Sequence, residues 1–233
     1  MDESGTVVIV GGTQGIGREL AQHYADLGQE VVISGRDEGR AKEEADAIGG
    51  RTVGVGFDLA RPHEIAPKLS GVQDVRHLVL AAIERDTNSV RDYDIDQALR
   101  LVTLKLVGYT ECIHALLPRM GPESSILLFG GLAKDRPYPG STTVTSVNGA
   151  VTTMVRTLVV ELAPIRVNAL HPGIVGDSPT WKDRPEVLER VLSRTPTGRM
   201  VMMRDVVEVA VLLLENRSVN GINVEVDGGW MAM

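Results

Sequence analysis

The sequence is poor in cysteine, in aromatic residues and in positive charge. Cys112 is the single cysteine in 233 residues, which excludes a disulfide framework or a cysteine metal cluster within one chain. Only 3% of the residues are aromatic, and 31 acidic residues outnumber 24 basic ones, so we expect no basic surface for a nucleic-acid backbone. No apolar run reaches the ~18 residues needed to span a bilayer, and the N-terminus shows no signal-peptide pattern. The sequence therefore predicts a soluble, cytoplasmic protein with no membrane or nucleic-acid partner.

The glycine-rich stretch from Thr6 to Leu20 is the most informative part of the chain. Thr6 to Val10 are β-prone and run directly into GGTQGIG, after which a helical pattern begins. Glycines without a Cβ let the backbone approach a pyrophosphate, and free N–H groups at a helix N-terminus favour that anion. The spacing is G-x-x-x-G-x-G, not the commoner G-x-G-x-x-G. We interpret it as a phosphate-binding turn; the alternative is a turn needed only for helix–strand packing.

Strands and helices alternate along the rest of the chain. Predicted strands follow the first one at 31–34, 52–57, 77–80, 125–129, 165–170 and 221–229, and predicted helices cover 16–27, 40–48, 62–69, 95–120, 144–162 and 205–214. This alternation predicts a doubly wound parallel α/β sheet of the Rossmann type, with about seven strands flanked by helices. The length suits a single domain over residues 1–233, with a ligand above the carboxyl ends of the strands.

Three motifs together resemble the short-chain dehydrogenase/reductase family, and the resemblance covers essentially the whole chain. They are the glycine spacing, IRVNALHPG at 165–173 and Asp-Gly-Gly at 227–229. Two positions depart from the family: Val10 replaces a usual Thr, and LAAI at 80–83 replaces Asn-Asn-Ala-Gly. The resemblance implies a substrate lid at about 177–203 and a dinucleotide held by Gly11, Thr13, Gln14, Gly15, Ile16, Gly17, Arg36, Asp58, Leu59, Ala81, Ala82, Pro172, Gly173 and Ile174.

Arg36 stands where the family reads the adenosine ribose. A guanidinium there neutralises a 2′-phosphate, whereas a carboxylate would accept hydrogen bonds from a 2′-hydroxyl. NADP(H) is therefore favoured over NAD(H), although Arg36 could also be a solvated residue opening a helix, and Asp37 beside it could weaken the preference. Asp58 is expected against the adenine, as the cap of the helix near Pro62, or in both roles.

The residues expected to catalyse the family reaction are missing. The resemblance implies a proton relay of Tyr, Lys, Ser and Asn beside the nicotinamide. The small pair at 149–150 fixes the register and puts Asn148 in place of the Lys, Val144 in place of the Tyr and Gly131 in place of the Ser. Lys105 replaces the helix Asn. Since losing a general acid costs ~10²–10⁴ in rate, we expect poor ketone reduction by the family mechanism.

Two functions remain open at this point. The first is an atypical oxidoreductase that transfers hydride to or from a small molecule needing no tyrosine proton, such as an iminium or an activated alkene. The second is a catalytically inactive, cofactor-binding pseudoenzyme with a regulatory or scaffold role; a ligand-free interaction protein would require a vestigial glycine turn. The substrate is not predicted.

Four residues are candidates for altered chemistry. Asp177 could pair with a cationic substrate or cap a helix of the lid. Arg136 and Tyr138 could face the substrate or belong to a surface loop, and Lys105 could reach the cavity or lie between helices. His171 is expected to be a packed loop residue, and the other histidines show no spacing for a metal.

The long helical stretches 95–120 and 144–162 carry apolar residues at helical spacing. In the resembled family such helices form a subunit contact, which implies a homodimer or homotetramer. Apolar stripes of this kind are otherwise ordinary core.

Overall fold

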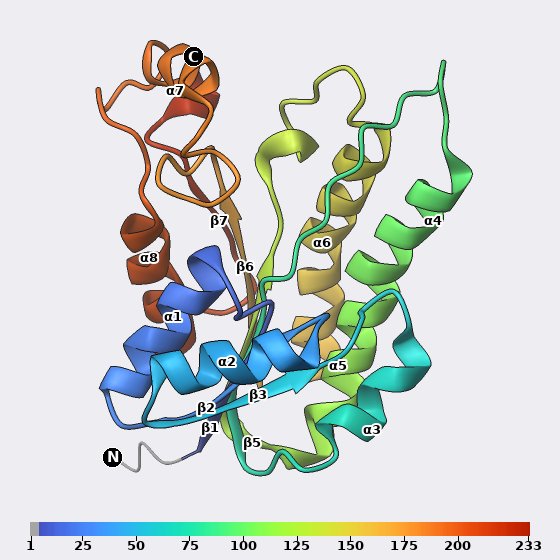
Figure 1. Cartoon of the computed structure of the whole chain (residues 1–233), viewed down its shortest axis with the longest axis vertical. Helices are drawn as coiled ribbons and strands as arrows, with labels where there is room; N and C mark the ends of the chain where they lie inside the picture. Colours follow the sequence, from blue (N-terminus) through green and yellow to red (C-terminus); the bar gives the residue numbers. More distant parts are fainter. Residues whose placement is uncertain (1–4) are drawn as a thin grey trace.

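A parallel sheet runs through the middle of the computed structural model, which describes residues 5–233 (Figure 1). The seven strands lie in the order β3-β2-β1-β4-β5-β6-β7, and every neighbouring pair is parallel. This confirms the predicted doubly wound, single-domain α/β fold. The strands are β1 (Thr6–Val10), β2 (Glu30–Gly35), β3 (Arg51–Gly56), β4 (Val75–Leu80), β5 (Met120–Phe129), β6 (Arg166–Pro172) and β7 (Asn223–Val226).

Helices cover both faces of the sheet, and the two-residue period of the strands fills both cores. Val8 and Val10 of β1 belong to one hydrophobic cluster, whereas Val7 and Ile9 belong to the other, as alternating side chains require. The first cluster packs under α3 (Ile65–Leu69), α5 (Tyr109–Leu116) and α6 (Thr142–Glu161), and the second under α1 (Gly15–Asp26), α2 (Glu38–Ile48) and α8 (Met203–Glu215) (Figure 1). The helix α4 (Ile95–Val102) packs on α6 through a small separate cluster that includes Leu101 and Val144.

The segment 177–203, predicted to be a lid and called the lid below, stands above the carboxyl ends of the strands (Figure 1). It contains the short helix α7 (Pro185–Leu192), drawn near the C-terminus in Figure 1. Ser178 Oγ donates to the carbonyl oxygen of Val175 at 2.8 Å and fixes the start of the lid next to β6. Short 3₁₀ turns complete the chain at η1 (Pro62–Glu64), η3 (Leu117–Arg119), η4 (Leu132–Lys134) and η5 (Trp230–Ala232).

A π-helical turn interrupts the long helix that was predicted over 95–120. This turn, η2 (Thr103–Gly108), separates α4 from α5. A Cβ at Gly108 would stand 2.4 Å from the carbonyl oxygen of Leu59, so the helix can pack this closely only with glycine at that position. π-Turns inside helices are frequent at functional sites, and η2 carries the buried Lys105. The interruption therefore concerns the site directly.

Within residues 5–233, no helix has the length and apolar character required to cross a membrane. The same residues hold no group of three metal-ligating side chains.

Candidate active site

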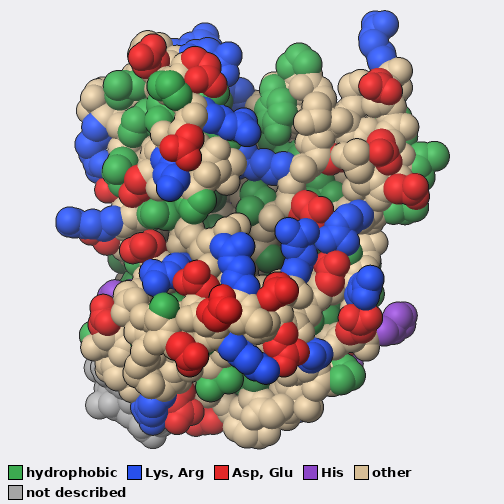
Figure 2. Space-filling view, viewed as in Figure 1, with side chains coloured by type: hydrophobic (Ala, Val, Ile, Leu, Met, Phe, Trp, Pro, Cys, Tyr) green, Lys and Arg blue, Asp and Glu red, His purple; other side chains and the backbone are tan. Residues whose placement is uncertain are grey.

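A cavity of about 880 Å³ opens at the carboxyl end of the sheet, between the strand ends and the lid. Figure 2 shows the hollow in the middle of this face, with Lys and Arg side chains around it. All fourteen residues expected to contact a dinucleotide line this cavity. The structure therefore brings the predicted cofactor residues together, although they come from five separate segments of the chain.

The glycine turn leaves no room for side chains. Gly11 has φ +90°, and a Cβ there would stand 2.5 Å from the backbone nitrogen of Ala82. A Cβ at Gly17 would stand 2.3 Å from the carbonyl oxygen of Gly11. At the N-terminus of α1, Gln14 makes no side-chain cap bond and no acidic residue occupies the first turn. The backbone N–H groups of the first turn of α1 and the helix dipole are thus available to an anion, so the turn fits a dinucleotide pyrophosphate.

Two arginines follow β2 at the expected adenosine end of the cavity. Arg36 and Arg40 both line it, and Arg40 Nη2 donates to Gln14 Oε1 at 3.0 Å. The Asp37 carboxylate accepts the backbone N–H of Arg40 at 2.7 Å and so caps α2. Asp37 is therefore committed to the helix, and the cations remain on the cavity side.

Asp58 forms a charged cluster with Arg100 on the same side. Arg100 Nη1 lies 3.0 Å from Asp58 Oδ2, and Arg100 Nε lies 2.9 Å from Glu84 Oε1. Although burial acts in the opposite direction, the backbone N–H of Ala60 and the Arg100 guanidinium lower the pKa of Asp58. The cap of the turn near Pro62 is Arg61, not Asp58, so the helix-capping role considered for Asp58 is wrong.

Three of the four positions expected to hold the family relay, 131, 144 and 148, line the cavity, as does the fourth, Lys105. A Cβ at Gly131 would stand 3.0 Å from Asn148 Nδ2, which places these two residues side by side, and Val144 lies one helical turn before Asn148. Among the lining residues of the described chain, Tyr138 is the single tyrosine, and it is 48% exposed. No tyrosine hydroxyl therefore stands at the position of Val144.

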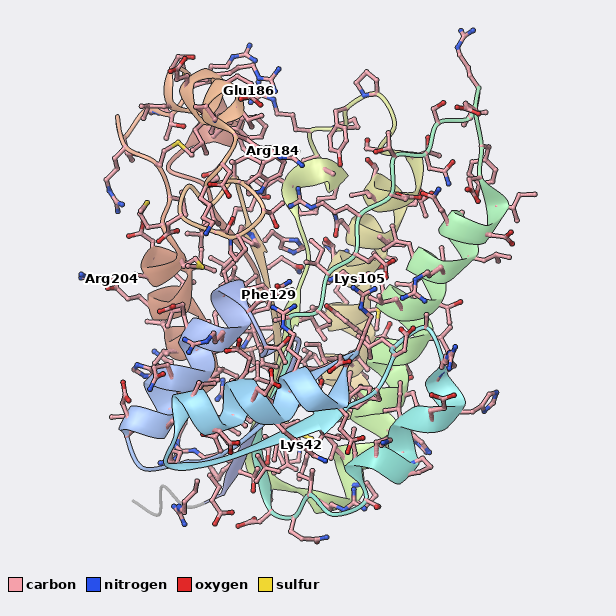
Figure 3. The ribbon with its side chains drawn as sticks, viewed as in Figure 1. Lys42, Lys105, Phe129, Arg184, Glu186 and Arg204 are labelled. Carbon is pink, nitrogen blue, oxygen red and sulfur yellow. The ribbon has the colours of Figure 1, made fainter. Side chains whose placement is uncertain are left out.

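Lys105 points into the protein interior at the floor of the cavity, near Phe129 (Figure 3). Its Nζ donates to the carbonyl oxygen of Phe129 at 2.6 Å, to Tyr109 Oη at 2.7 Å and to the carbonyl oxygen of Ala82 at 3.3 Å. Burial lowers the pKa of Lys105 to about 7, and the positive charge of Arg85 acts in the same direction. The ammonium thus has three neutral acceptors and no carboxylate.

Comparisons with known proteins agree with this geometry. Residues 10–231 match the model of a family described as enoyl-(acyl carrier protein) reductase. The 3-oxoacyl-[acyl-carrier-protein] reductase of Bos taurus is 30% identical over 229 residues, which cover 95% of each chain. The chain belongs to the short-chain dehydrogenase/reductase family. L-rhamnose 1-dehydrogenase (NAD(P)(+)) of Azotobacter vinelandii is 30% identical over 244 residues, covering 96% of this chain and 95% of the relative. A solved short chain dehydrogenase/reductase family protein is 28% identical with a TM-score of 0.86, covering 100% of both chains.

Of the four candidates for altered chemistry in this short-chain dehydrogenase/reductase, three reach the cavity. Arg136, Tyr138 and Lys105 line it, whereas Asp177 does not. Asp177 Oδ1 instead accepts the backbone N–H of Met203 at 2.8 Å, at the start of α8. The interpretation of Asp177 as a partner for a cationic substrate is therefore wrong: its carboxylate serves a helix N-terminus, and that helix is α8, not a helix of the lid. His171 is buried and bonded to Asn223, as expected of a packed residue, but it lies in strand β6 and not in a loop.

Sequence reasoning missed several residues of the cavity. Arg100, which does not itself line the cavity, lies outside every motif of the short-chain dehydrogenases/reductases that was identified in the sequence, yet it pairs with the lining residues Asp58 and Glu84. Arg85 and Arg184 approach the ring of Trp181 from different segments, at 4.7 and 5.4 Å from its centroid. The excess of arginine between residues 184 and 199 was a signal in the sequence. Whether these side chains face the cavity depends on how the lid folds.

The Lys105 environment predicts a pH-dependent stability. The unfolded chain holds the Lys105 proton up to a pKa near 10.4, whereas the folded chain releases it at about 7. The unfolded state binds more protons between these values, so the folded state gains stability as pH rises through this window. Lys105→Met should remove that gain. The unfolding free energy of the unmodified protein minus that of the variant should rise by about 3 kcal/mol from pH 7 to pH 10.

Urea unfolding of both proteins at several pH values measures this difference. Lys42→Met, on the exposed surface of α2, controls for the loss of one lysine anywhere in the chain. A difference between the unmodified protein and Lys105→Met that stays constant with pH would contradict an uncompensated buried charge.

Proposed function

We propose that this chain is an NADP(H)-dependent oxidoreductase with a non-standard catalytic site, acting on a small molecule that needs no proton from a tyrosine. The observation that carries the proposal is one cavity in which a glycine turn fit for a dinucleotide faces positions 131, 144 and 148 without their usual functional groups. An iminium carbon or an activated alkene accepts hydride without an acid at a carbonyl oxygen. Neither electrophile requires the tyrosine proton that Val144 cannot supply.

The preference for NADP(H) rests on Arg36 and Arg40. Both side chains line the adenosine end, and the nearby acids are engaged elsewhere: Asp37 caps α2, and Glu84 pairs with Arg100. A 2′-phosphate between two guanidiniums would gain charge-assisted hydrogen bonds. When bound, the cofactor supplies or accepts the hydride.

The chain's own residues orient the reactants and exclude water. Asn148 and the backbone around Gly131 offer hydrogen bonds at the strand-β5 side. Lys105 stabilises the carboxyl ends of β4 and β5 by binding the carbonyl oxygens of Ala82 and Phe129.

The second candidate function is a cofactor-binding pseudoenzyme with a regulatory or scaffold role. The engagement of all three Lys105 protons by neutral acceptors favours it, because no free acid then stands at the floor. Cofactor binding would be retained without turnover.

The experiment is a calorimetric titration with NADPH and NADH, followed by an electrophile panel. We expect NADPH to bind more tightly than NADH. We further expect NADPH oxidation with a cyclic iminium or a conjugated enone to exceed that with a simple ketone by about 10²-fold, since only the ketone needs the missing acid. Binding without turnover of any member of the panel would favour the pseudoenzyme. No binding of either cofactor would overturn both functions.

A homodimer or homotetramer through the long helices is also proposed. Ile95 and Leu99 of α4 and Val107 of η2 are 62%, 59% and 50% exposed, and Val160 of α6 is 80% exposed. Such apolar surface is typical of subunit contacts. Sedimentation velocity measures the mass, and a monomer at all concentrations would contradict this assembly.

A further inference from the structure

The charges that line the cavity are divided between its two ends. The acids among the lining residues, Asp37, Asp58 and Glu84, all belong to the adenosine end, where each has a partner. The substrate end, between the β5–α6 loop and the lid, carries no acid among its lining residues in the described chain. Its cations are Arg85, Lys105, Arg136, Arg184, Arg190 and Arg194.

None of these six cations forms an ion pair within residues 5–233. The whole protein has a formal net charge of −7, so such a concentration of unpaired positive charge does not follow from composition. Like charges that share a concave, partly desolvated site repel one another until a negative charge enters. An anion bound at the substrate end would therefore relieve this repulsion.

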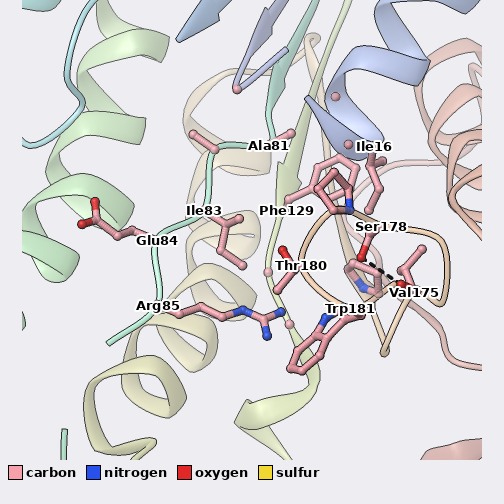
Figure 4. A pocket seen from close by; sticks show the side chains of 18 of the residues that line it. Ile16, Ala81, Ile83, Glu84, Arg85, Phe129, Val175, Ser178, Thr180 and Trp181 are labelled. Carbon is pink, nitrogen blue, oxygen red and sulfur yellow. Dashed lines mark hydrogen bonds between the residues drawn. The ribbon is translucent and has the colours of Figure 1, made fainter. Parts of the chain in front are cut away.

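Two tryptophans hold three of these arginines in place. The guanidinium carbons of Arg85 and Arg184 lie 4.7 and 5.4 Å from the ring centroid of Trp181, and Figure 4 shows Arg85 reaching from the loop after β4 towards that ring. Arg136 lies 4.0 Å from the ring centroid of Trp230, and its Nη1 donates to the Trp230 carbonyl oxygen at 2.8 Å. Cation–π contacts orient a guanidinium without neutralising it, so its N–H donors stay available.

Arg85 and Arg184 influence each other directly. Arg85 is exposed to the water of the cavity, with other protein groups close to its guanidinium. Desolvation lowers the pKa of its guanidinium, and the charge of Arg184 acts in the same direction. Since both guanidiniums contact one ring, a single anionic group beside Trp181 can meet both. Arginine forks match carboxylate and phosphate oxygens geometrically.

We propose that the substrate end of the cavity binds a small organic anion, with its carboxylate or phosphate group on Arg85 and Arg184 beside Trp181. The apolar body of this ligand lies towards the nicotinamide side, against Ile83, Val144 and Leu104. The identification of this anion as a substrate rests on the proposed function. The anion site itself does not depend on turnover.

The test uses the two tryptophans as reporters, because Trp181 and Trp230 are the only ones in the chain. The full-length protein is titrated with benzoate, phenyl phosphate and the neutral benzamide while tryptophan fluorescence is followed, with and without saturating NADP⁺. We expect at least one anion to bind about tenfold or more tightly than benzamide, with an affinity that falls as salt is added. The stronger of the two anions distinguishes a carboxylate from a phosphate site.

Arg85→Gln and Arg184→Gln should each weaken anion binding several-fold and leave benzamide unaffected. Arg204→Gln is the matched control, since Arg204 lies on α8 outside the cavity with an 86% exposed side chain (Figure 3). Its anion affinity should equal that of the unmodified protein. Thermal unfolding of each variant verifies that it folds.

Three results would overturn the anion site. The first is that neither anion binds more tightly than benzamide. The second is that the anion affinity is unchanged in both arginine variants. The third is that NADP⁺ displaces the anion, which would place the anion at the nucleotide end. If the anion binds in this pattern but NADP⁺ does not bind, the proposed function fails and the anion site stands. If NADP⁺ binds and the anions do not, the anion site fails and the proposed function stands.

Discussion

Replacing Gly17 by alanine is expected to lower the affinity for NADPH at least ~100-fold, a loss of about 2.7 kcal/mol. The new Cβ would stand 2.3 Å from the carbonyl oxygen of Gly11 and 3.0 Å from its carbonyl carbon. Both are backbone atoms of a turn that also touches Ala82, so neither can yield independently. The turn must open, and the N–H groups at the start of α1 then lose their common direction. Isothermal titration calorimetry measures the affinity.

The same substitution strains the junction of β1 and α1, and overpacking of this kind costs about 1–3 kcal/mol of stability. Circular dichroism at the titration temperature therefore has to show a folded variant. Gly71→Ala is the matched control, because no atom lies within 4 Å of its added Cβ and it is remote from the cavity. NADPH binding by Gly17→Ala at the unmodified affinity would mean that the glycine turn is not the phosphate site.

The cofactor half of the cavity could be predicted from the sequence because its information is local. The turn from Gly11 to Gly17 requires glycine for reasons contained in the turn and its neighbouring strand end. Strand ends in a parallel sheet converge at one edge, so residues such as Asp58 and Pro172 could be assigned to one site without coordinates. The alternation of strand and helix predicted the sheet for the same reason.

The substrate half depends on how distant segments pack, and there the sequence was a poorer guide. Lys105 was recognised as a replacement, but its burial follows from the π-turn η2, which helical periodicity does not reveal. The approach of Arg85 and Arg184 to Trp181 joins the β4–α4 loop to the lid, 96 residues or more along the chain. The sequence left two roles open for Asp177 because a capping carboxylate and a ligand-binding carboxylate look alike in sequence, and the bond from Met203 decides for capping, although of α8 and not of a lid helix.

Replacing Arg36 by alanine is expected to lower the affinity for NADPH about 10- to 100-fold and to leave the affinity for NADH nearly unchanged. A hydrogen bond to a charged group contributes about 1.5–3 kcal/mol, and NADH lacks the phosphate that would receive it. Arg36 Nη1 lies 4.0 Å from Glu84 Oε2, at the limit of an ion pair, and the Arg36 side chain is 70% exposed. The guanidinium is thus free to turn to a ligand at little cost. Parallel titrations with both cofactors measure the selectivity.

The control for this selectivity is Arg61→Ala, which removes an exposed arginine, 3.5 Å from Glu64, that does not line the cavity. Equal losses for NADPH and NADH in Arg36→Ala would show that Arg36 acts on a part common to both cofactors, such as the adenine. No loss for either cofactor would transfer the role to Arg40, whose bond to Gln14 ties it to the glycine turn. Selective loss, in contrast, would mean that Arg36 binds the 2′-phosphate at the end of β2, beside an Asp37 carboxylate that is already engaged in capping α2.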